Sequence, residues 1–321
     1  MKKIEEHLEK SCLPEGMLAL DIETAGFSRD RDPVFLVGAL LGGTEFDTFF
    51  QWIHTSDSPE EEASLLRAIR PVLAAHPILT YNGDAFDLPF LAHRARRHHL
   101  TWPEMESFDL YRKLRQKKKM LDLPNLKLET VERSLGICRS DVLSGGEVAA
   151  LFRHLSISAC GTEEESAVRA LLLHNREDVL YTAALLKFWQ NFRVQRSFSF
   201  TPAPLLPTTF QLEEAVHKKD FIYLYFFLDP PFLKACEIEN QEGRLEIQQA
   251  QAVLRLPVQE ARFGKEKIVI AVAPDSPSDH SPYQLRHPLL CLCDRKRIYV
   301  ENCLAYARSF LSAIPFSEIQ S

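Results

Sequence analysis

Two acidic residues, Asp21 and Glu23, close the apolar segment "LALDIET", which we expect to form a strand. One residue separates them, so in a strand both side chains lie on the same face. Burying two like charges side by side raises at least one pKa and costs several kcal/mol unless a cation lies between them. The pair therefore indicates either a metal site or, taken alone, a surface turn after a strand.

Two further acidic residues stand beside predicted elements. Asp87 follows the strand in "PILTYNG" by one helical step, and Asp178 opens a helix predicted over 176–192. Taken alone, each is also explained as a residue that caps or favours a helix N-terminus. Together with the first pair they supply four hard oxygen ligands, which is what two Mg²⁺ or Mn²⁺ ions require. Such an ion pair activates a water molecule and stabilises both oxygens of an in-line phosphoryl displacement.

The composition is that of an ordinary globular protein. The chain has 321 residues, of which 45% are hydrophobic and 26% charged, and this length predicts one large or two smaller domains. No segment approaches the roughly 18–20 apolar residues that span a bilayer. The start, "MKKIEEHLEK", has no apolar segment typical of a secretory signal. We therefore expect a cytoplasmic protein with no membrane partner.

The net charge is −6, with 38 Lys and Arg against 44 Asp and Glu, which argues against a chain-wide attraction to nucleic acid but leaves room for a local basic groove. The seven cysteines are scattered and include no CxxC pair. Reduced thiols are therefore favoured over structural zinc, and "CLC" at Cys291 to Cys293 is the nearest approach to a ligand pair.

The periodicity of apolar residues predicts the elements in order. Strands are expected over 16–24, 33–43, 45–53 and 77–83. Helices are expected over 58–76, 85–100, 123–137, 145–155, 162–175 and 176–192, and 107–116 begins as a short strand. Three sequential strands followed by alternating helices and strands predict an α/β fold with a mixed sheet flanked by helices.

The composition changes sharply at "SFSFTPAPLLPTTF", whose three prolines predict a semi-rigid linker or an extended cover strand. Beyond it, segments rich in β-branched and aromatic residues predict a smaller, β-rich C-terminal domain of unknown role, closed by a short helix near 302–314. The expected division is a first domain over 1–195, a Pro-rich linker over 196–210 and a second domain over 211–321.

The segments "DIET", "NGDAFD" and "HNREDV" resemble the three exonuclease motifs of the DEDD nucleases, which belong to the ribonuclease H-like superfamily. The resemblance extends over about residues 17–192, with the motifs in the right order. "SFDLYRKLRQ", "NLKLETVERSLGI" and "GGEVAALFRHL" resemble more narrowly the bacterial YprB-type branch of predicted exonucleases. The resemblance implies a ribonuclease H-like fold and a metal-dependent 3′–5′ exonuclease.

The same resemblance assigns roles to individual residues. Two divalent ions, Mg²⁺ or Mn²⁺, would be held by Asp21, Glu23, Asp87 and Asp178. In the second motif an aromatic residue precedes the acid and an asparagine stands four residues earlier, here Phe86 and Asn82. The third motif carries a Tyr four residues, or a His five residues, before its Asp. Here His174 stands at the tyrosine spacing.

Two interpretations of His174 stay open. It orients or deprotonates the attacking water, as histidines often do. Alternatively, Asn175 and Asp178 form a capping box, and His174 merely ends the preceding helix. Asp84 matches no motif position and is expected to be exposed.

Several residues are candidates for contact with nucleic acid. "RKLRQKKK" is the densest basic run in the chain and either follows a phosphate backbone or forms a solvated surface. The resemblance places the backbone of Thr24 near a terminal nucleotide. Tyr81 and Phe27 either stack on bases or belong to the core. Asn82 and Phe86 of the second motif are candidates as well, and the basic candidates are Arg112, Lys113, Arg115, Lys117, Lys118, Lys119 and Lys127.

The sequence thus predicts a hydrolase that removes nucleotides stepwise from a 3′ end of single-stranded DNA or RNA by a two-metal mechanism. Two alternatives stay open. One is a non-catalytic nucleic-acid-binding module, and the other is a hydrolase of a short oligonucleotide or a dinucleotide. A closed pocket would favour the small substrate, and an open groove lined by Arg112 to Lys119 would favour a polymer.

Overall fold

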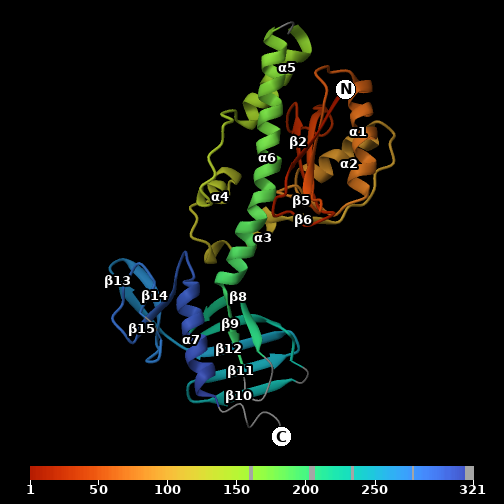
Figure 1. Ribbon diagram of the computed structural model, residues 1–321. Helices are drawn as coiled ribbons and strands as arrows, with labels where there is room; N and C mark the ends of the chain where they lie inside the picture. The colour runs from red at the N-terminus through yellow and green to blue at the C-terminus, as the bar shows by residue number, and fades with distance from the viewer. Residues whose placement is uncertain (159–161, 202–206, 233–234, 277, 315–321) are drawn as a thin grey trace. The chain divides into compact units, whose positions relative to one another are not determined.

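The computed structural model describes residues 1–158, 162–201, 207–232, 235–276 and 278–314. The chain divides into two compact units (Figure 1). The first unit comprises Met1–Gln116 and Leu123–Trp189, and the second comprises Lys117–Asp122 and the chain from Gln190 onward.

The first unit is built on one mixed sheet of six strands in the order β1-β4-β3-β2-β5-β6. The strands are β1 (Lys2–Glu9), β2 (Leu18–Thr24), β3 (Val34–Leu41), β4 (Phe46–Ile53), β5 (Ile78–Thr80) and β6 (Ser107–Asp109). The first four are antiparallel neighbours, whereas β5 runs parallel to both β2 and β6. The predicted α/β fold with a mixed sheet is confirmed.

Helices cover both faces of this sheet. They are α1 (Pro59–Ala74), α2 (Asp87–Arg97), α3 (Leu110–Gln116), α4 (Leu128–Ser134), α5 (Gly145–Ser158) and α6 (Thr162–Gln195). In Figure 1, α6 lies on the side of β2 opposite to α1 and α2. Leu20 and Ile22 of β2 belong to the core shared with α1 and α2. Phe35 of β3 stacks on Phe152 of α5 in the core of the other face, with ring centroids 4.0 Å apart.

Strand β1 has no counterpart among the predicted elements. It pairs antiparallel with β4 from Lys2, opposite Ile53, to Glu9, opposite Phe46. Only every second side chain is half-buried, and the remaining positions are exposed and mostly charged. Charged side chains protect an edge strand from pairing with another chain. They also weaken the apolar alternation by which a strand is recognised in a sequence.

The second unit is β-rich, as predicted. Its larger sheet has six antiparallel strands in the order β10-β11-β12-β9-β8-β7. These are β7 (Ser197–Phe200), β8 (Thr208–Lys218), β9 (Phe221–Asp229), β10 (Cys236–Asn240), β11 (Gly243–Gln248) and β12 (Gln251–Pro257). A three-stranded antiparallel sheet, a 3₁₀ turn and one helix complete the unit: β13 (Gln259–Phe263), β14 (Glu266–Val272), β15 (Leu289–Asp294), η1 (Lys118–Met120) and α7 (Val300–Ala313).

The segment expected to be a Pro-rich linker, 196–210, carries ordered strand at both ends. Ser197–Phe200 is β7, which pairs antiparallel with β8, and β8 itself begins at Thr208. Phe198 and Phe210 stack with centroids 5.4 Å apart, so their burial explains why these ends join the sheet. Residues 202–206, which include two of the three prolines, lie outside the described residues.

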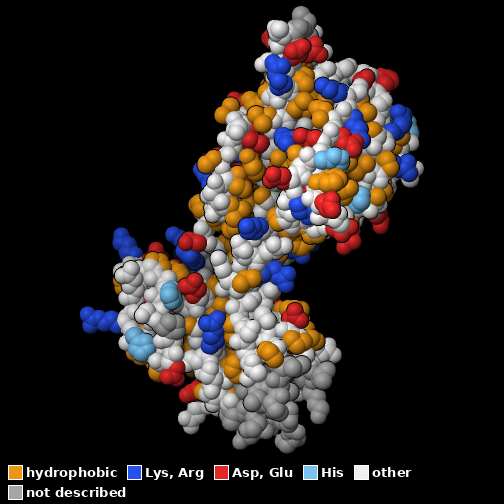
Figure 2. Space-filling model, in the orientation of Figure 1, with side chains coloured by type: hydrophobic (Ala, Val, Ile, Leu, Met, Phe, Trp, Pro, Cys, Tyr) orange, Lys and Arg blue, Asp and Glu red, His pale blue; other side chains and the backbone are white. Residues whose placement is uncertain are grey.

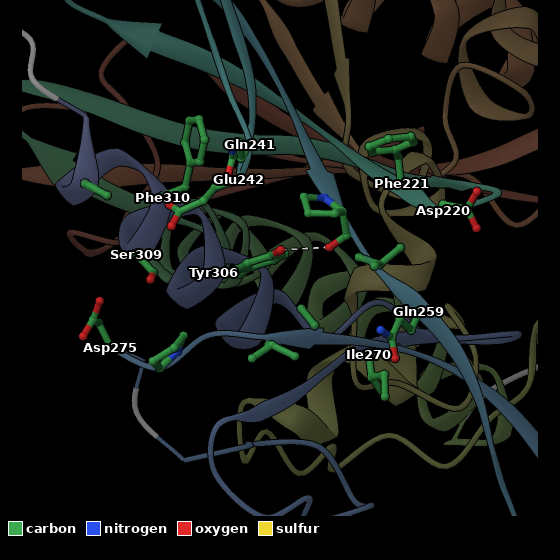
Figure 3. A pocket seen from close by; sticks show the side chains of 16 residues that line it. Asp220, Phe221, Gln241, Glu242, Gln259, Ile270, Asp275, Tyr306, Ser309 and Phe310 are labelled. Atoms are coloured by element: carbon green, nitrogen blue, oxygen red, sulfur yellow. Dashed lines mark hydrogen bonds between the residues drawn. The ribbon is translucent and has the colours of Figure 1, made fainter.

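A cavity of about 580 Å³ lies in the second unit, beside β13, β14 and α7 (Figure 3). Phe221, Ile270 and Phe310 are among its apolar lining residues, and the Tyr306 hydroxyl donates a hydrogen bond of 2.8 Å to the Pro257 carbonyl. The charged residues among the described lining are the carboxylates Asp220, Glu242 and Asp275. Carboxylates repel phosphate, so this cavity is not suited to a nucleic-acid backbone.

The described cysteines are free thiols. Cys291, Cys293 and Cys303 are buried in the second unit, and burial raises the pKa of Cys291 to about 12 and that of Cys293 to about 11. Cys138 is exposed, and Cys160 lies outside the described residues. Among the helices of the described chain, none is long and apolar enough to cross a membrane.

Candidate active site

Strand β2 presents Asp21 and Glu23 toward α6. Leu20 and Ile22 alternate with them and face the core under α1 and α2, so both acids lie on the opposite side of the sheet, as the strand period predicts. Glu23 is buried at 8% exposure and Asp21 is half-buried. The predicted surface turn is therefore not what this pair forms.

Asp87 is the first residue of α2 and enters the same site through the turn after β5. Its Oδ1 accepts a 3.2 Å hydrogen bond from the Ile22 backbone N–H, which ties it to β2 between the two other acids. Asn82 adopts a left-handed backbone (φ 70°) in this turn, a conformation that asparagine tolerates well. Buried Asp109 fixes the turn by accepting from the N–H groups of Asn82 (2.9 Å) and Asp84 (3.1 Å).

Helix α6 supplies His174 and Asp178, one helical turn apart. His174 Nε2 lies 3.8 Å from Glu23 Oε1 and 3.9 Å from Asp178 Oδ2. One potential ligand atom from each of these three residues lies within 4.8 Å of the other two. Side chains from β2, from α6 and from the N-terminus of α2 thus converge on one site.

The capping interpretation of Asn175 and Asp178 is wrong, because α6 is one helix of 34 residues that runs through both positions. The Asn175 side chain is fully buried and makes tertiary contacts instead of a cap. Its Nδ2 donates to Asp21 Oδ2 at 2.9 Å, and its Oδ1 accepts from Gln51 at 3.0 Å. A Cβ at Gly38, opposite Asp21 on β3, would lie 2.2 Å from Asn175 Oδ1, so glycine permits this close packing of sheet and helix.

Three carboxyl groups of the site have a raised pKa. Burial is the largest cause for Asp21, Glu23 and Asp87, and the charge of Asp178 raises the pKa of each further. The pKa of Asp87 rises to about 7. Glu23 Oε1 is buried without a hydrogen-bond partner among the described residues. Acids that repel one another around an unsatisfied buried oxygen fit a divalent cation, whose charge removes both costs.

The acids line a cavity of about 600 Å³ in the first unit. Besides Asp21, Glu23, Asp87, Asp178 and His174, its lining includes Tyr81, Asn82, Phe86 and Lys127. Polar and apolar groups therefore meet at the carboxylates, as in a site that holds a charged ligand with an apolar part.

Comparison with known proteins identifies the family of this chain. A family model described as the RNase H superfamily matches residues 18–190, which include every acid of the site. The chain belongs to the RNase H superfamily. A search of curated proteins found no match.

Several solved structures resemble the chain weakly. The family B DNA polymerase from the hyperthermophilic archaeon Pyrobaculum calidifontis is 16% identical, with a TM-score of 0.40, and the match covers 60% of this chain and 29% of the polymerase. E. coli exonuclease I in complex with a dT13 oligonucleotide is 15% identical, with a TM-score of 0.31 and coverage of 66% and 55%. A structure described as the apo form of a nuclease is 19% identical, with a TM-score of 0.30 and coverage of 55% and 75%. This chain thus spans less than two thirds of the polymerase and of exonuclease I.

The irregular segment after α4 brings further residues to the site of this RNase H superfamily chain. Arg139 contacts Asp178 Oδ1 and also binds buried Glu132 of α4 through two hydrogen bonds of 2.6 and 2.7 Å. Asp141 lies 2.6 Å from His174 Nδ1. Neither Arg139 nor Asp141 was singled out in the sequence, because the segment has no periodicity and their partners on α6 lie far along the chain.

The predicted nucleic-acid-binding residues separate into two groups. Asn82, Phe86 and Lys127 line the cavity of the carboxylates. Thr24 stands beside Glu23, and its hydroxyl donates its proton to the Gly26 carbonyl at 2.7 Å. Tyr81 donates its hydroxyl to Leu126 O at 2.7 Å.

The basic run 112–119 does not line this cavity. Arg112 pairs with Asp84 at 3.2 Å, Lys113 lies over the Phe108 ring, and Arg115 is exposed. The three lysines at 117–119 belong to the second unit, where Lys117 pairs with Glu213 at 2.6 Å. On the face of the first unit that Figure 2 shows, basic side chains are interspersed with acidic ones.

Proposed function

We propose that this chain is a metal-dependent nuclease that removes nucleotides from the 3′ end of single-stranded DNA or RNA. Within the RNase H superfamily we assign it to the DEDD exonucleases, in the YprB-type branch that its motifs resemble. The observation that carries the proposal is the convergence of Asp21, Glu23, Asp87 and Asp178 on one cavity, where neighbouring carboxylates raise the pKa of Asp21, Glu23 and Asp87, and Glu23 Oε1 has no hydrogen-bond partner among the described residues.

These four carboxylates are the proposed ligands of two divalent cations, Mg²⁺ or Mn²⁺. Hard oxygen donors suit both ions, and carboxylates that repel one another are stabilised when a cation neutralises them. When bound, two such ions lower the pKa of a water molecule and stabilise the attacking and leaving oxygens of a phosphodiester.

His174 is the proposed acceptor of the proton from the attacking water. Its Nε2 faces Glu23 and Asp178, at 3.8 and 3.9 Å from their carboxylate oxygens. The water oxygen forms a bond to phosphorus, and the bond between phosphorus and the 3′ oxygen breaks. The products are a nucleoside 5′-monophosphate and a strand shortened by one nucleotide, whose 3′ oxygen takes up a proton.

Substrate contacts are assigned to the residues around the carboxylates. Phe86 presents an aromatic ring and Asn82 an amide at the cavity, which suit a terminal base or sugar. Lys127 is exposed at the same cavity and suits a phosphate. Arg112, Lys113 and Arg115 of α3 are proposed to contact the strand beyond the cavity, because they belong to the same unit.

The proposal is tested by incubating 5′-labelled single-stranded DNA and RNA oligonucleotides with the full chain in Mn²⁺, Mg²⁺ or EDTA. We expect a ladder of shortened products that requires metal. The double variant Asp21→Asn, Glu23→Gln should produce no ladder, because it removes charge from two proposed ligands. Glu45→Gln, which changes an exposed acid of the same unit, is the matched control and should cleave like the wild type.

Three outcomes would overturn parts of this assignment. A ladder that persists in the double variant would remove the carboxylates from the reaction. Cleavage of dinucleotides alone would replace the polymer nuclease with a hydrolase of short substrates. Binding of oligonucleotides without any cleavage by folded, metal-loaded protein would indicate a non-catalytic binding module.

A further inference from the structure

We propose that Asp141 is a positioning residue that fixes the ring of His174 and its tautomer, with Nε2 left free to accept a proton. The inference rests on the proposed function, in which His174 takes the proton of the attacking water. Asp141 lies outside the three motifs, in the irregular segment between α4 and α5. The contact with Asp141 explains how His174, on α6, can accept a proton at Nε2.

The contact between the two side chains is short and enclosed. Asp141 Oδ2 lies 2.6 Å from His174 Nδ1, and the two side chains are only 3% and 8% exposed. An ionised carboxylate can only accept a hydrogen bond, so Nδ1 carries the proton and donates it. In a neutral imidazole the other nitrogen, Nε2, is then the acceptor.

Asp141 is itself held in place from α6. Glu177, three residues after His174 on that helix, accepts from the N–H groups of Ser140 and Asp141, at 3.0 Å each. The second oxygen of Asp141 accepts from the Leu143 N–H at 3.1 Å. The segment is therefore bound to the helix that carries the histidine, and the Asp141 carboxylate is oriented before any ligand arrives.

The free nitrogen faces the reaction site. His174 and Asp141 both line the cavity of the carboxylates, and Nε2 is the atom that approaches Glu23 and Asp178. If the ring turned over, carbon atoms would take the places of Nδ1 and Nε2, and Asp141 would lose its donor. Asp141 on one side of the imidazole, and Glu23 and Asp178 on the other, thus define its orientation.

The test replaces Asp141 by Asn, which keeps the size of the side chain but can donate a hydrogen bond to Nδ1. Nitrogen-15 NMR of protein labelled at histidine, recorded without metal and at a pH at which the imidazole is neutral, reports which ring nitrogen carries the proton, and His174→Ala identifies the signal. We expect Nδ1–H in the wild type and Nε2–H in Asp141→Asn. In the nuclease assay kcat should fall by about 10–100-fold with KM unchanged, as for residues that orient a reacting group.

Three comparisons separate positioning from a merely structural role. Glu147→Gln alters another carboxylate that fixes the same segment, through Ser144, but does not contact His174, so both tautomer and kcat should stay as in the wild type. On a His174→Ala background, Asp141→Asn should cause no further loss of kcat. Asp141→Glu, which keeps a carboxylate, should retain more activity than Asp141→Asn.

An unchanged His174 tautomer in Asp141→Asn would overturn the inference, as would a full additional loss on the His174→Ala background. The proposed function fails differently. If the wild type cleaves nothing but Asp141→Asn still exchanges the tautomer, the nuclease assignment is wrong while the positioning of His174 by Asp141 stands.

Discussion

Asp21→Asn is expected to raise the melting temperature of the metal-free protein and to abolish its nuclease activity. Burial, followed by the charges of Asp178, Glu23 and Asp87, raises the pKa of Asp21 well above its usual range. A carboxyl group whose pKa is raised in the folded state destabilises that state at any pH above its unfolded value, so at neutral pH the charge costs stability. Asparagine removes the charge and can still accept the hydrogen bond that Asn175 donates at 2.9 Å.

The expected gain is a few degrees, since 1 kcal/mol corresponds to roughly 2–4 °C for a unit of 150–250 residues. The expected loss of activity exceeds the ~10–100-fold typical of residues that only orient a ligand, because a proposed ligand itself is removed. Calorimetry in EDTA, with Glu45→Gln as the control, measures the first effect. Saturating Mn²⁺ should then stabilise the wild type more than the variant. A melting temperature in EDTA that is lower for Asp21→Asn than for the wild type would show that repulsion among the carboxylates does not destabilise the fold.

Arg139→Gln is expected to cause a large loss of stability in the first unit. The Arg139 guanidinium binds Glu132, whose side chain is 1% exposed, through hydrogen bonds of 2.6 and 2.7 Å, and it also contacts Asp178. Without it, a buried carboxylate keeps its charge but loses its cation. Removing one partner of a buried ion pair typically costs about 3–5 kcal/mol. Arg139 also lowers the pKa of Glu23, so its loss adds to the repulsion among the acids.

An arginine within α4, the helix that carries Glu132, provides the control. Arg133 pairs with Glu129 four residues earlier on α4, with both side chains more than half exposed at 67% and 58%. Arg133→Gln should cost no more than about 0.5 kcal/mol. Urea unfolding of both variants in EDTA measures the difference. Equal losses in the two variants would mean that the buried pair contributes no more than an exposed one, and Glu132→Gln added to Arg139→Gln should recover part of the loss.

The places of three acids on their own elements were predictable from local geometry, and the resemblance to three motifs grouped them with Asp178. The strand period places Asp21 and Glu23 on one face, and the turn after β5 delivers Asp87 as the first residue of α2. The mixed sheet follows from the order of the apolar segments. These features depend on neighbours in the sequence, so patterns of spacing reveal them.

What could not be predicted depends on contacts between distant segments. Asn175 has the residue type of a helix cap, but its bonds to Asp21 and Gln51 keep it inside an unbroken α6. Lys117 reads as part of one basic surface, yet it pairs with Glu213, 96 residues later. Asp141 and Arg139 lie in a segment without periodicity, so only the folded structure shows that they reach α6.

The central claim is that four carboxylates form a site for two divalent cations. Titration of the metal-free chain with Mn²⁺, followed by electron paramagnetic resonance of the free ion, measures this directly and does not depend on the choice of substrate. We expect two Mn²⁺ ions bound per wild-type chain, and weak or absent binding in the Asp21→Asn, Glu23→Gln double variant. Absence of binding to the wild type, or equal binding by both proteins, would contradict the account.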